Sequence, residues 1–515
     1  MGVDARHPLY DKYIDTWIKC ADAYEGQEAI KAKQSKYLPR LSGHMVEHEK
    51  QITADERSRG WMNSDTEYQL YLQRAVFYNY TKKITNGLNE QLFRKDVKLE
   101  TPAVMQSIVD NFTYDGKSIK TAIKESNKRI LLKYRDVLVL DFPKSTTEGP
   151  ISQAQAESMN LRPYAVYYTA DQVINWNYEI INNKLELTRV VIEEHIEEQD
   201  PDDEFIMKDV LQYRVLDLST QDENGFDTGV RKYRIRLFKK SEKEEEIDTI
   251  FPKIKGEYLT YIPCFFLTPK GISDDLDYPM MNDAVDINIA HYINSADYEN
   301  AINITGSPTP VIVGYNTEPD SDEDIALGSR ALLLYGQNAQ AYYMEYKGQG
   351  PDAIAKAMDK KVDALSVIAS RMLQNDPKGI ESAETAEIHR SAEQGMLSSM
   401  ALSLSEAYEV ILNIIADWMN VTGNITVMFN TDYSIKNIDP NLFSNLTTAR
   451  QAGAISQYLY FYNLLKGEMV PEDWTYEQEN EARAEDAVAQ ATLTVGFDEE
   501  EEEQTEETEE EETEE

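Results

Sequence analysis

The stretch that decides the fold begins with PMMNDAVDINIAHYINSADYENAI (279–302) and returns, after an insert rich in Pro and Gly, with PDAIAKAMDKKVDALSVIASRML (351–373). The polar loop NDPKGIES (375–382) follows, and then the long segment 383–419. Proline is favoured at the first position of a helix, whereas proline and glycine within the loop stop one. The pattern therefore predicts two helices that flank a small β insert, then a loop and one long helix.

Apolar residues in the segment 383–419 follow a 3-4-3-4 spacing, which places them on one narrow face of a helix. At about 1.5 Å per residue, such a helix spans roughly 55 Å. A narrow apolar face suits packing on another helix, although an amphipathic core helix of any large protein is the alternative. The face consists of Leu397, Met400, Leu404, Ala407, Ile411, Ile414 and Trp418.

The chain has 515 residues, enough for two to four structural units, and a net charge of −41. Asp498–Glu515 contains 14 acidic residues and no basic one, and removing these charges still leaves −27. An acidic surface repels nucleic acid and anionic lipid at long range, which argues against a specific DNA reader. It also suits a passage through which DNA slides without sticking, although solubility is the commoner reason for such a balance.

Cys20 and Cys264 are the only cysteines, so we expect neither a disulfide framework nor a Cys-based zinc site. Two distant thiols favour a reducing compartment. The first residues lack an apolar signal core, and the longest apolar runs are too short to span a bilayer. We therefore expect a soluble protein that does not contact a membrane.

The predicted fold class is α+β and mainly α-helical. Residues 8–135 are expected to be helical, with a capping box at Ser64–Glu67 that starts a long helix reaching about Phe93. Residues 137–267 contain β-rich, partly alternating segments that predict an antiparallel sheet. The charged segments 197–204 and 241–246 are expected to be loops or hairpin tips.

Candidate catalytic and metal-binding patterns are weak. The string His44-Met-Val-Glu47-His48 matches the H-x-x-E-H pattern of some zinc peptidases, but no third ligand follows at a recognisable spacing. Phosphate-binding glycine loops and the G-x-S-x-G elbow are missing from the sequence. We therefore expect no enzyme, no metal and no cofactor, with a hydrolase as the remaining minor alternative.

Isolated titratable residues add little to an enzyme hypothesis. His195, His291 and His389 have no nearby cysteine and no convincing triad partner in the sequence. Acidic pairs such as Glu193/Glu194 are expected by chance in so acidic a chain. We expect this pair to be a solvated strand or loop end.

The two helices of the opening stretch differ in charge. The first contains Asp283, Asp286, Asp297 and Glu299 and no cation, whereas the second carries Lys356, Lys360, Lys361 and Arg371 among its acids. Helices of opposite bias can pair between neighbouring subunits, although ordinary solvated faces remain an alternative.

Three separated segments resemble signatures of the portal protein of tailed bacteriophages. They are GQEAIKAKQSKYLPRL (26–41), RPYAVYYTADQVINW (162–176) and GIESAETAEIHRSAE (379–393). The resemblance runs over nearly the whole chain. The anatomy that it implies is a wing (1–277), a first stem helix (278–302), a clip (303–350), a second stem helix (351–374), a tunnel loop (375–382), a long wing helix and strand (383–439), a crown (440–490) and a disordered acidic tail (491–515).

This resemblance implies a ring, usually of twelve copies, at the unique vertex of the capsid. Double-stranded DNA enters and leaves through it without sequence-specific contacts. The implied partners are the large subunit of the terminase, head–tail adaptor or neck proteins, the major capsid protein and the scaffolding protein. The implied location is the virion, after assembly in the cytoplasm of the bacterial host. A non-viral acidic α+β scaffold or adaptor without a pore is the alternative.

The resemblance also assigns residues to the passage and to docking. A Pro-Lys-Gly loop lets a single cation meet a passing phosphate backbone without reading bases. The implied channel residues of the tunnel loop are Asn375, Asp376, Pro377, Lys378, Gly379, Ile380 and Glu381. The implied docking residues of the clip are Pro308, Pro310, Glu318, Asp320 and Arg330.

Overall fold

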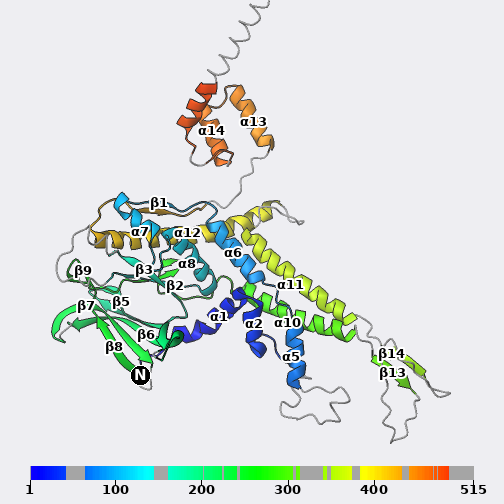
Figure 1. Ribbon diagram of the computed structural model, residues 1–515. Coiled ribbons are helices and arrows are strands. Elements are labelled where there is room, and N and C mark those ends of the chain that lie inside the picture. Colours follow the sequence, from blue (N-terminus) through cyan, green and yellow to red (C-terminus); the bar gives the residue numbers. More distant parts are fainter. Residues whose placement is uncertain are drawn as a thin grey trace, which may run out of the picture. The chain divides into compact units, whose positions relative to one another are not determined.

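The computed structural model divides the chain into two compact units, Met1–Asp432 and Tyr433–Glu515. Each unit is described by itself (Figure 1). The residues that the structure describes are 2–41, 64–143, 161–200, 202–222, 225–240, 244–305, 309–313, 340–344, 349–373, 383–431, 440–467, 469–471 and 474–486.

The first unit mixes helices and sheets, which confirms the predicted α+β class. One antiparallel sheet has the strand order β12-β11-β2-β3 and is central to the core, because most of β2 is buried. Its strands are β2 (Asp136–Asp141), β3 (Tyr164–Thr169), β11 (Cys264–Thr268) and β12 (Gly271–Ile272). A small separate pair joins β1 (Lys98–Glu100) to β15 (Thr426–Met428).

The second sheet is a five-stranded antiparallel meander with the order β4-β5-β6-β7-β8. Its strands are β4 (Val173–Ile181), β5 (Lys184–Asp200), β6 (Asp203–Gln221), β7 (Asp227–Lys240) and β8 (Glu244–Ile250). The segment 197–204 does contain the tip of the β5–β6 hairpin, as one of the two predicted alternatives, but a loop was wrong for the strand residues on either side of the turn and for 244–246, which lie in β8. Residues 241–243 lie outside the described residues. These strand ends could not be predicted from the sequence. Neither of their faces is buried, so their residues do not alternate between apolar and polar.

The helical region predicted at 8–135 is confirmed for most of its described residues, but the strand β1 lies within it and was not expected. Serine and asparagine cap two of the helices: Ser118 accepts a hydrogen bond from the Thr121 N–H, and Asn79 accepts one from the Lys82 N–H. The helices are α1 (Pro8–Glu25), α2 (Gln27–Ala32), α5 (Ser64–Arg74), α6 (Tyr80–Leu92), α7 (Gln106–Asp110) and α8 (Ile119–Lys133).

The single long helix predicted from Ser64 to Phe93 is wrong, because the chain breaks between α5 and α6. Backbone groups in the break find side-chain partners elsewhere in the fold. The Val76 N–H donates to Ser295 Oγ (3.1 Å), and the Phe77 N–H donates to Gln27 Oε1 (3.2 Å). These distant side chains replace helical hydrogen bonds, so local sequence could not reveal the break.

The helix α12 (Ala383–Met419) has the predicted bounds. It packs against β11, β12 and β15 as well as the preceding helix α11 (Gln349–Leu373), so the alternative of an amphipathic core helix holds and a narrow face packed on another helix alone was wrong. The buried face is broader and also includes Ala401, Tyr408 and Leu412. The segment Leu397–Met419 is long and apolar enough to cross a membrane, but 56% of its most apolar window is buried, as in a core helix.

The second unit contains α13 (Pro440–Gln451), α14 (Gln457–Lys466) and a further helical stretch at 476–486. The buried Phe461 ring lies 5.6 Å from the ring of Tyr476, which joins α14 to this stretch. Helices were predicted for 440–490, and the described part agrees. The acidic residues 491–515 lie outside the described residues.

Candidate assembly site: the helices α10 and α11

The helix α10 (Asn282–Thr305) is bound to the rest of the first unit by a row of polar side chains along one of its faces. The buried Asn288 accepts from the Thr81 N–H (3.0 Å) and donates to the Tyr78 carbonyl (2.9 Å). One and two turns further along, His291 and Ser295 are also buried, and Ser295 Oγ donates to the Val76 carbonyl (2.7 Å). The backbone at the break between α5 and α6 therefore supplies the hydrogen bonds that anchor α10.

The helix α11 (Gln349–Leu373) lies beside α10 and is far less covered by its own chain (Figure 1). Of residues 350–368, whose side chains are described, Leu365 alone is buried. Apolar side chains remain exposed on both helices: 41% of Ile302, near the C-terminal end of α10, and 45% of Val367, toward the C-terminal end of α11, are accessible to solvent. The two helices thus form an arm with an incompletely covered apolar surface.

Two of the predicted stem residues have partners within the chain. Asp286 Oδ1 lies 2.5 Å from Lys19 Nζ of α1, and Asp297 accepts a hydrogen bond from the Tyr71 hydroxyl of α5 (2.6 Å). These acids help to seat α10 on the first unit. Their predicted contacts between subunits stay predictions.

The remaining residues predicted for the stem differ in charge between the two helices, with acids on α10 and mostly cations on α11. Asp283, Lys356 and Lys360 are exposed, whereas Glu299 and Lys361 are partly buried. Among the described side chains, no ion pair joins α10 to α11, so these charges do not neutralise one another within the chain. The side chain of Arg371 lies outside the described ones.

The buried His291 makes stability dependent on pH. Its ring lies edge-on to Tyr78 (5.5 Å) and Tyr80 (5.6 Å). Burial lowers the pKa of His291, the nearby Lys361 lowers it further, and Asp359 opposes them. The unfolded chain, with a pKa near 6.5, therefore takes up this proton first as the pH falls.

We expect the first unit to lose thermal stability as the pH falls below about 6.5, and the His291→Gln variant to lose less. The contribution of His291 is fully present above that pH and disappears as acid favours the unfolded state. Thermal midpoints measured between pH 7.5 and pH 5.5 provide the test. The exposed His195 gives the control, since His195→Gln should keep the acid sensitivity of the parent. Equal acid sensitivity in His291→Gln and the parent would show that other groups cause it.

The segment predicted as the clip, 303–350, is described only in part. The strands β13 (Thr309–Val313) and β14 (Gln340–Met344) form an antiparallel pair in which Pro310 lies opposite Tyr343. This confirms the small β insert predicted between the two helices. Of the residues predicted to dock partners, Pro308, Glu318, Asp320 and Arg330 lie outside the described residues, as does the predicted tunnel loop at 375–382, including Lys378.

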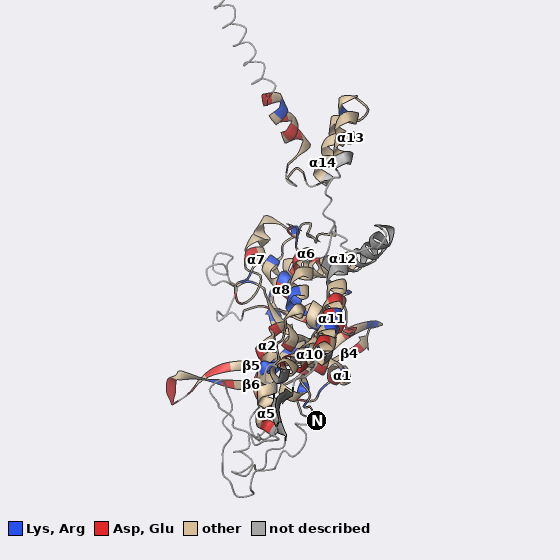
Figure 2. Cartoon of the chain, turned by 90° about the vertical axis from the view of Figure 1, so that its right-hand side faces the viewer, with Lys and Arg blue, Asp and Glu red and all other residues tan. Residues whose placement is uncertain are grey.

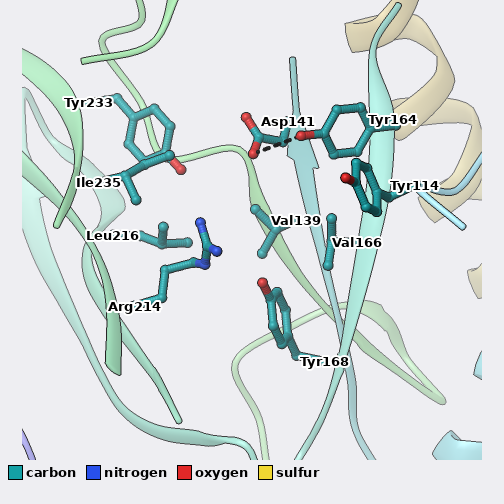
Figure 3. A pocket seen from close by; sticks show the side chains of 10 residues that line it. All are labelled: Tyr114, Val139, Asp141, Tyr164, Val166, Tyr168, Arg214, Leu216, Tyr233 and Ile235. Carbon is teal, nitrogen blue, oxygen red and sulfur yellow. Dashed lines mark hydrogen bonds between the residues drawn. The ribbon is translucent and has the colours of Figure 1, made fainter. Parts of the chain in front are cut away.

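A cavity of about 380 Å³ lies between the two sheets (Figure 3). Arg214 points into it from β6, and the Tyr164 hydroxyl donates to Asp141 Oδ2 across its rim (3.3 Å). Burial raises the pKa of Tyr164 and Tyr168, so both phenols stay protonated and act as donors. The described lining contains no serine, cysteine or histidine.

Beside this cavity, Glu194 corrects a prediction. It was expected to be solvated, but only 8% of it is exposed. Its carboxylate accepts hydrogen bonds from Tyr168 (2.7 Å), Gln212 (2.8 Å) and Arg214 (2.6 Å). A carboxylate that accepts three hydrogen bonds is a structural link between the two sheets. The sequence around Glu194 could not reveal this, because its partner Tyr168 lies on a different sheet, 26 residues away in the chain.

Metal-binding candidates can be assessed only where the chain is described. In those ranges, no three His, Cys, Asp or Glu side chains gather as a possible metal site. The H-x-x-E-H string at 44–48 lies outside them. His195 is exposed, and its Nδ1 lies 2.9 Å from Asp209 Oδ2 across the β5–β6 pair.

Comparison with known proteins gives one family match. Residues 279–419 match the family described as "Domain of unknown function (DUF4055)". The matched segment runs from the start of the predicted first stem helix to the end of α12. No curated protein matches the chain.

Similar solved structures include chains from gene transfer agent (GTA) particles. One is from "Neck of native GTA particle computed with C12 symmetry" (10% identity, 75% of this chain and 89% of that chain covered, TM-score 0.35). Another is from "Neck of empty GTA particle computed with C6 symmetry" (11% identity, 73% and 86% covered, TM-score 0.35). TM-scores this low do not establish a shared fold.

Proposed function

We propose that this chain is the subunit of a portal ring at one vertex of a tailed-phage capsid, and that double-stranded DNA passes through the ring during packaging and ejection. The proposal includes no catalytic step. It places α10 and α11 in the stem, the β13–β14 insert in the clip and residues 375–382 at the passage. The support comes from the three sequence segments noted above and from the exposed helical arm.

The observation that carries the proposal is the arm formed by α10 and α11. α10 is firmly seated by Asn288 and Ser295, whereas α11 buries one described side chain within its own chain. Solvated helices with apolar surface of this kind are stabilised mainly by tertiary or quaternary packing. Neighbouring copies arranged around an axis would cover this surface.

The opposite charges of α10 and α11 also favour contacts in which α10 of one copy meets α11 of the next. A closed ring uses heterologous interfaces, in which one face of a subunit meets a different face of the next. The acidic α10 and the lysines of α11 are chemically complementary faces of that kind. The excess of negative charge over the whole chain would keep phosphates from adhering to the passage.

The implied partners belong to the same proposal. Terminase and neck proteins would dock at the clip, and the capsid and scaffolding proteins would surround the ring. The virion is then the proposed location.

Negative-stain electron microscopy of the purified protein, with mass photometry, tests the proposal. We expect closed rings with an axial hole and roughly twelvefold symmetry in top views. Closed rings would exclude the alternative of a pore-free scaffold. A defined dimer, an open filament, or monomers that persist at tens of micromolar would contradict the proposal.

A further inference from the structure

The strands β5 and β6 extend as a two-stranded ribbon beyond the rest of their sheet. β4 pairs with β5 only as far as Ile192, and β7 pairs with β6 only from Gln212 onward. Residues 195–200 and 203–211 therefore pair with each other alone among the described strands. Figure 2 shows this ribbon extending away from the body of the first unit. It is defined here as residues 195–211.

The ribbon exposes apolar side chains that a solvated hairpin would not need. Phe205 is 87% exposed, Met207 53% and Ile206 48%. No described residue of the ribbon is buried. A two-stranded hairpin is marginally stable alone in water, and its open edges invite pairing. A ribbon about 20 Å long with an apolar tip is therefore expected to rest on another surface.

The remaining side chains of the ribbon are mostly acidic. Lys208 pairs with Asp200 (2.6 Å), and His195 lies beside Asp209. The exposed carboxylates of Glu197 and Glu204 have no cationic partner among the described residues. The chain as a whole carries −41, so a second copy repels the ribbon unless it offers a local group of cations.

The first unit offers such a group on α6 and α8. The lysine face is defined as Lys82 and Lys83 near the start of α6 together with Lys120, Lys124 and Lys128, which follow α8 at a spacing of four residues. Lys82 and Lys128 converge on the Tyr24 ring, at 5.6 and 5.7 Å from its centroid.

The cations of this face are only partly neutralised within the chain. Lys120 pairs with Asp96 (3.0 Å), whereas the other four have no carboxylate partner among the described side chains. An uncompensated lysine face is unexpected in a chain with 92 acidic and 51 basic residues. The lysine face therefore offers cations that could pair with the unpaired carboxylates of the ribbon.

We propose that the ribbon of one copy docks on the lysine face of another copy of this chain. The apolar tip would pack beside the aliphatic stems of the lysines, and Glu197 and Glu204 would meet their ammonium groups. This inference deepens the proposed function, since it rests on the ring for the identity of the neighbouring copy. The contact itself can be tested without rings.

Cross-linking between copies tests the contact directly. Full-length Met207→Cys and Lys124→Cys variants are mixed and treated with a short bismaleimide; the native Cys20 and Cys264 are buried. We expect at least tenfold more cross-linked dimer from the mixture than from either variant alone. Rings that form without this cross-link would overturn the inference and leave the proposed function standing. Cross-linked pairs from a protein that forms no rings would support the ribbon contact and contradict the proposed function.

Exchanging the charges of the two surfaces provides a second test. Recovery of assembly in the combined variant would show that the separate variants did not fail through misfolding. We expect Glu197→Lys/Glu204→Lys and Lys124→Glu/Lys128→Glu each to lower the assembled fraction at least tenfold. The variant with all four changes has the net charge of the parent and should recover assembly to within about twofold. Failure of this recovery, with the monomer folded, would overturn the proposal. So would lysine variants that assemble normally but lose binding to double-stranded DNA or to a separate protein.

Discussion

Replacing Asp136 with alanine is expected to lower the free energy of unfolding of the first unit by about 3–5 kcal/mol. Asp136 lies at the start of β2 with no exposed surface, and its carboxylate accepts two hydrogen bonds from Arg129, at 2.8 and 2.9 Å. Burial raises the pKa of Asp136, and the Arg129 guanidinium opposes that rise. The substitution leaves this guanidinium without its carboxylate, beside the Tyr167 ring at 5.2 Å.

Urea unfolding followed by circular dichroism measures the loss, and two variants locate its cause. Asp96→Ala removes an acid from the exposed pair with Lys120 and should cost less than about 1 kcal/mol. Arg129→Met/Asp136→Ala removes both charges and should recover most of the stability. If Asp136→Ala costs no more than Asp96→Ala, the buried pair does not contribute as the geometry indicates.

Local patterns were sufficient for much of the fold. The segment 383–419 was predicted as a helix with the bounds of α12, and the capping box at Ser64–Glu67 predicted the start of α5. In both elements the decisive signals lie within a few residues of one another. The β-rich region predicted at 137–267 is likewise confirmed, and β2 at its start is almost continuously apolar, as is typical of a strand buried on both faces.

The missed features depend on residues that are distant in sequence. The break between α5 and α6 is fixed by Gln27 and Ser295, and glycine at 87 lies inside the intact helix α6 rather than at the break. Glu194 is buried by partners on β3 and β6. Neither burial nor a hydrogen-bond partner of this kind is encoded in a local pattern.

The candidate site was only partly accessible from sequence. The charge difference between α10 and α11 was visible in the residue types alone. Which charges remain available depends on packing: Asp286 and Asp297 are engaged by α1 and α5, whereas Lys356 and Lys360 are exposed. The β5–β6 ribbon was missed because its acidic strands resemble a loop when no face is buried.

Reversing two charges on α11 is expected to prevent assembly of the proposed ring. The Lys356→Glu/Lys360→Glu variant changes two exposed cations that have no carboxylate partner among the described side chains. If these lysines face the acidic α10 of a neighbouring copy, each interface gains repulsion between like charges, which costs several kcal/mol. We expect the assembled fraction in mass photometry to fall at least tenfold, equivalent to about 1.4 kcal/mol or more per contact.

A matched control separates this local effect from the general increase in negative charge. Lys98→Glu/Lys184→Glu changes two exposed lysines outside α11 and shifts the net charge by the same amount. It should assemble like the parent, because screening limits the reach of exposed charges to about 10 Å at 0.1 M salt. Both variants should keep the thermal midpoint of the parent monomer, since substitutions at exposed positions usually change the free energy of unfolding by no more than about 0.5 kcal/mol. Normal assembly of the α11 variant would exclude α11 from the interface, whereas equal loss in both variants would indicate general repulsion between acidic copies.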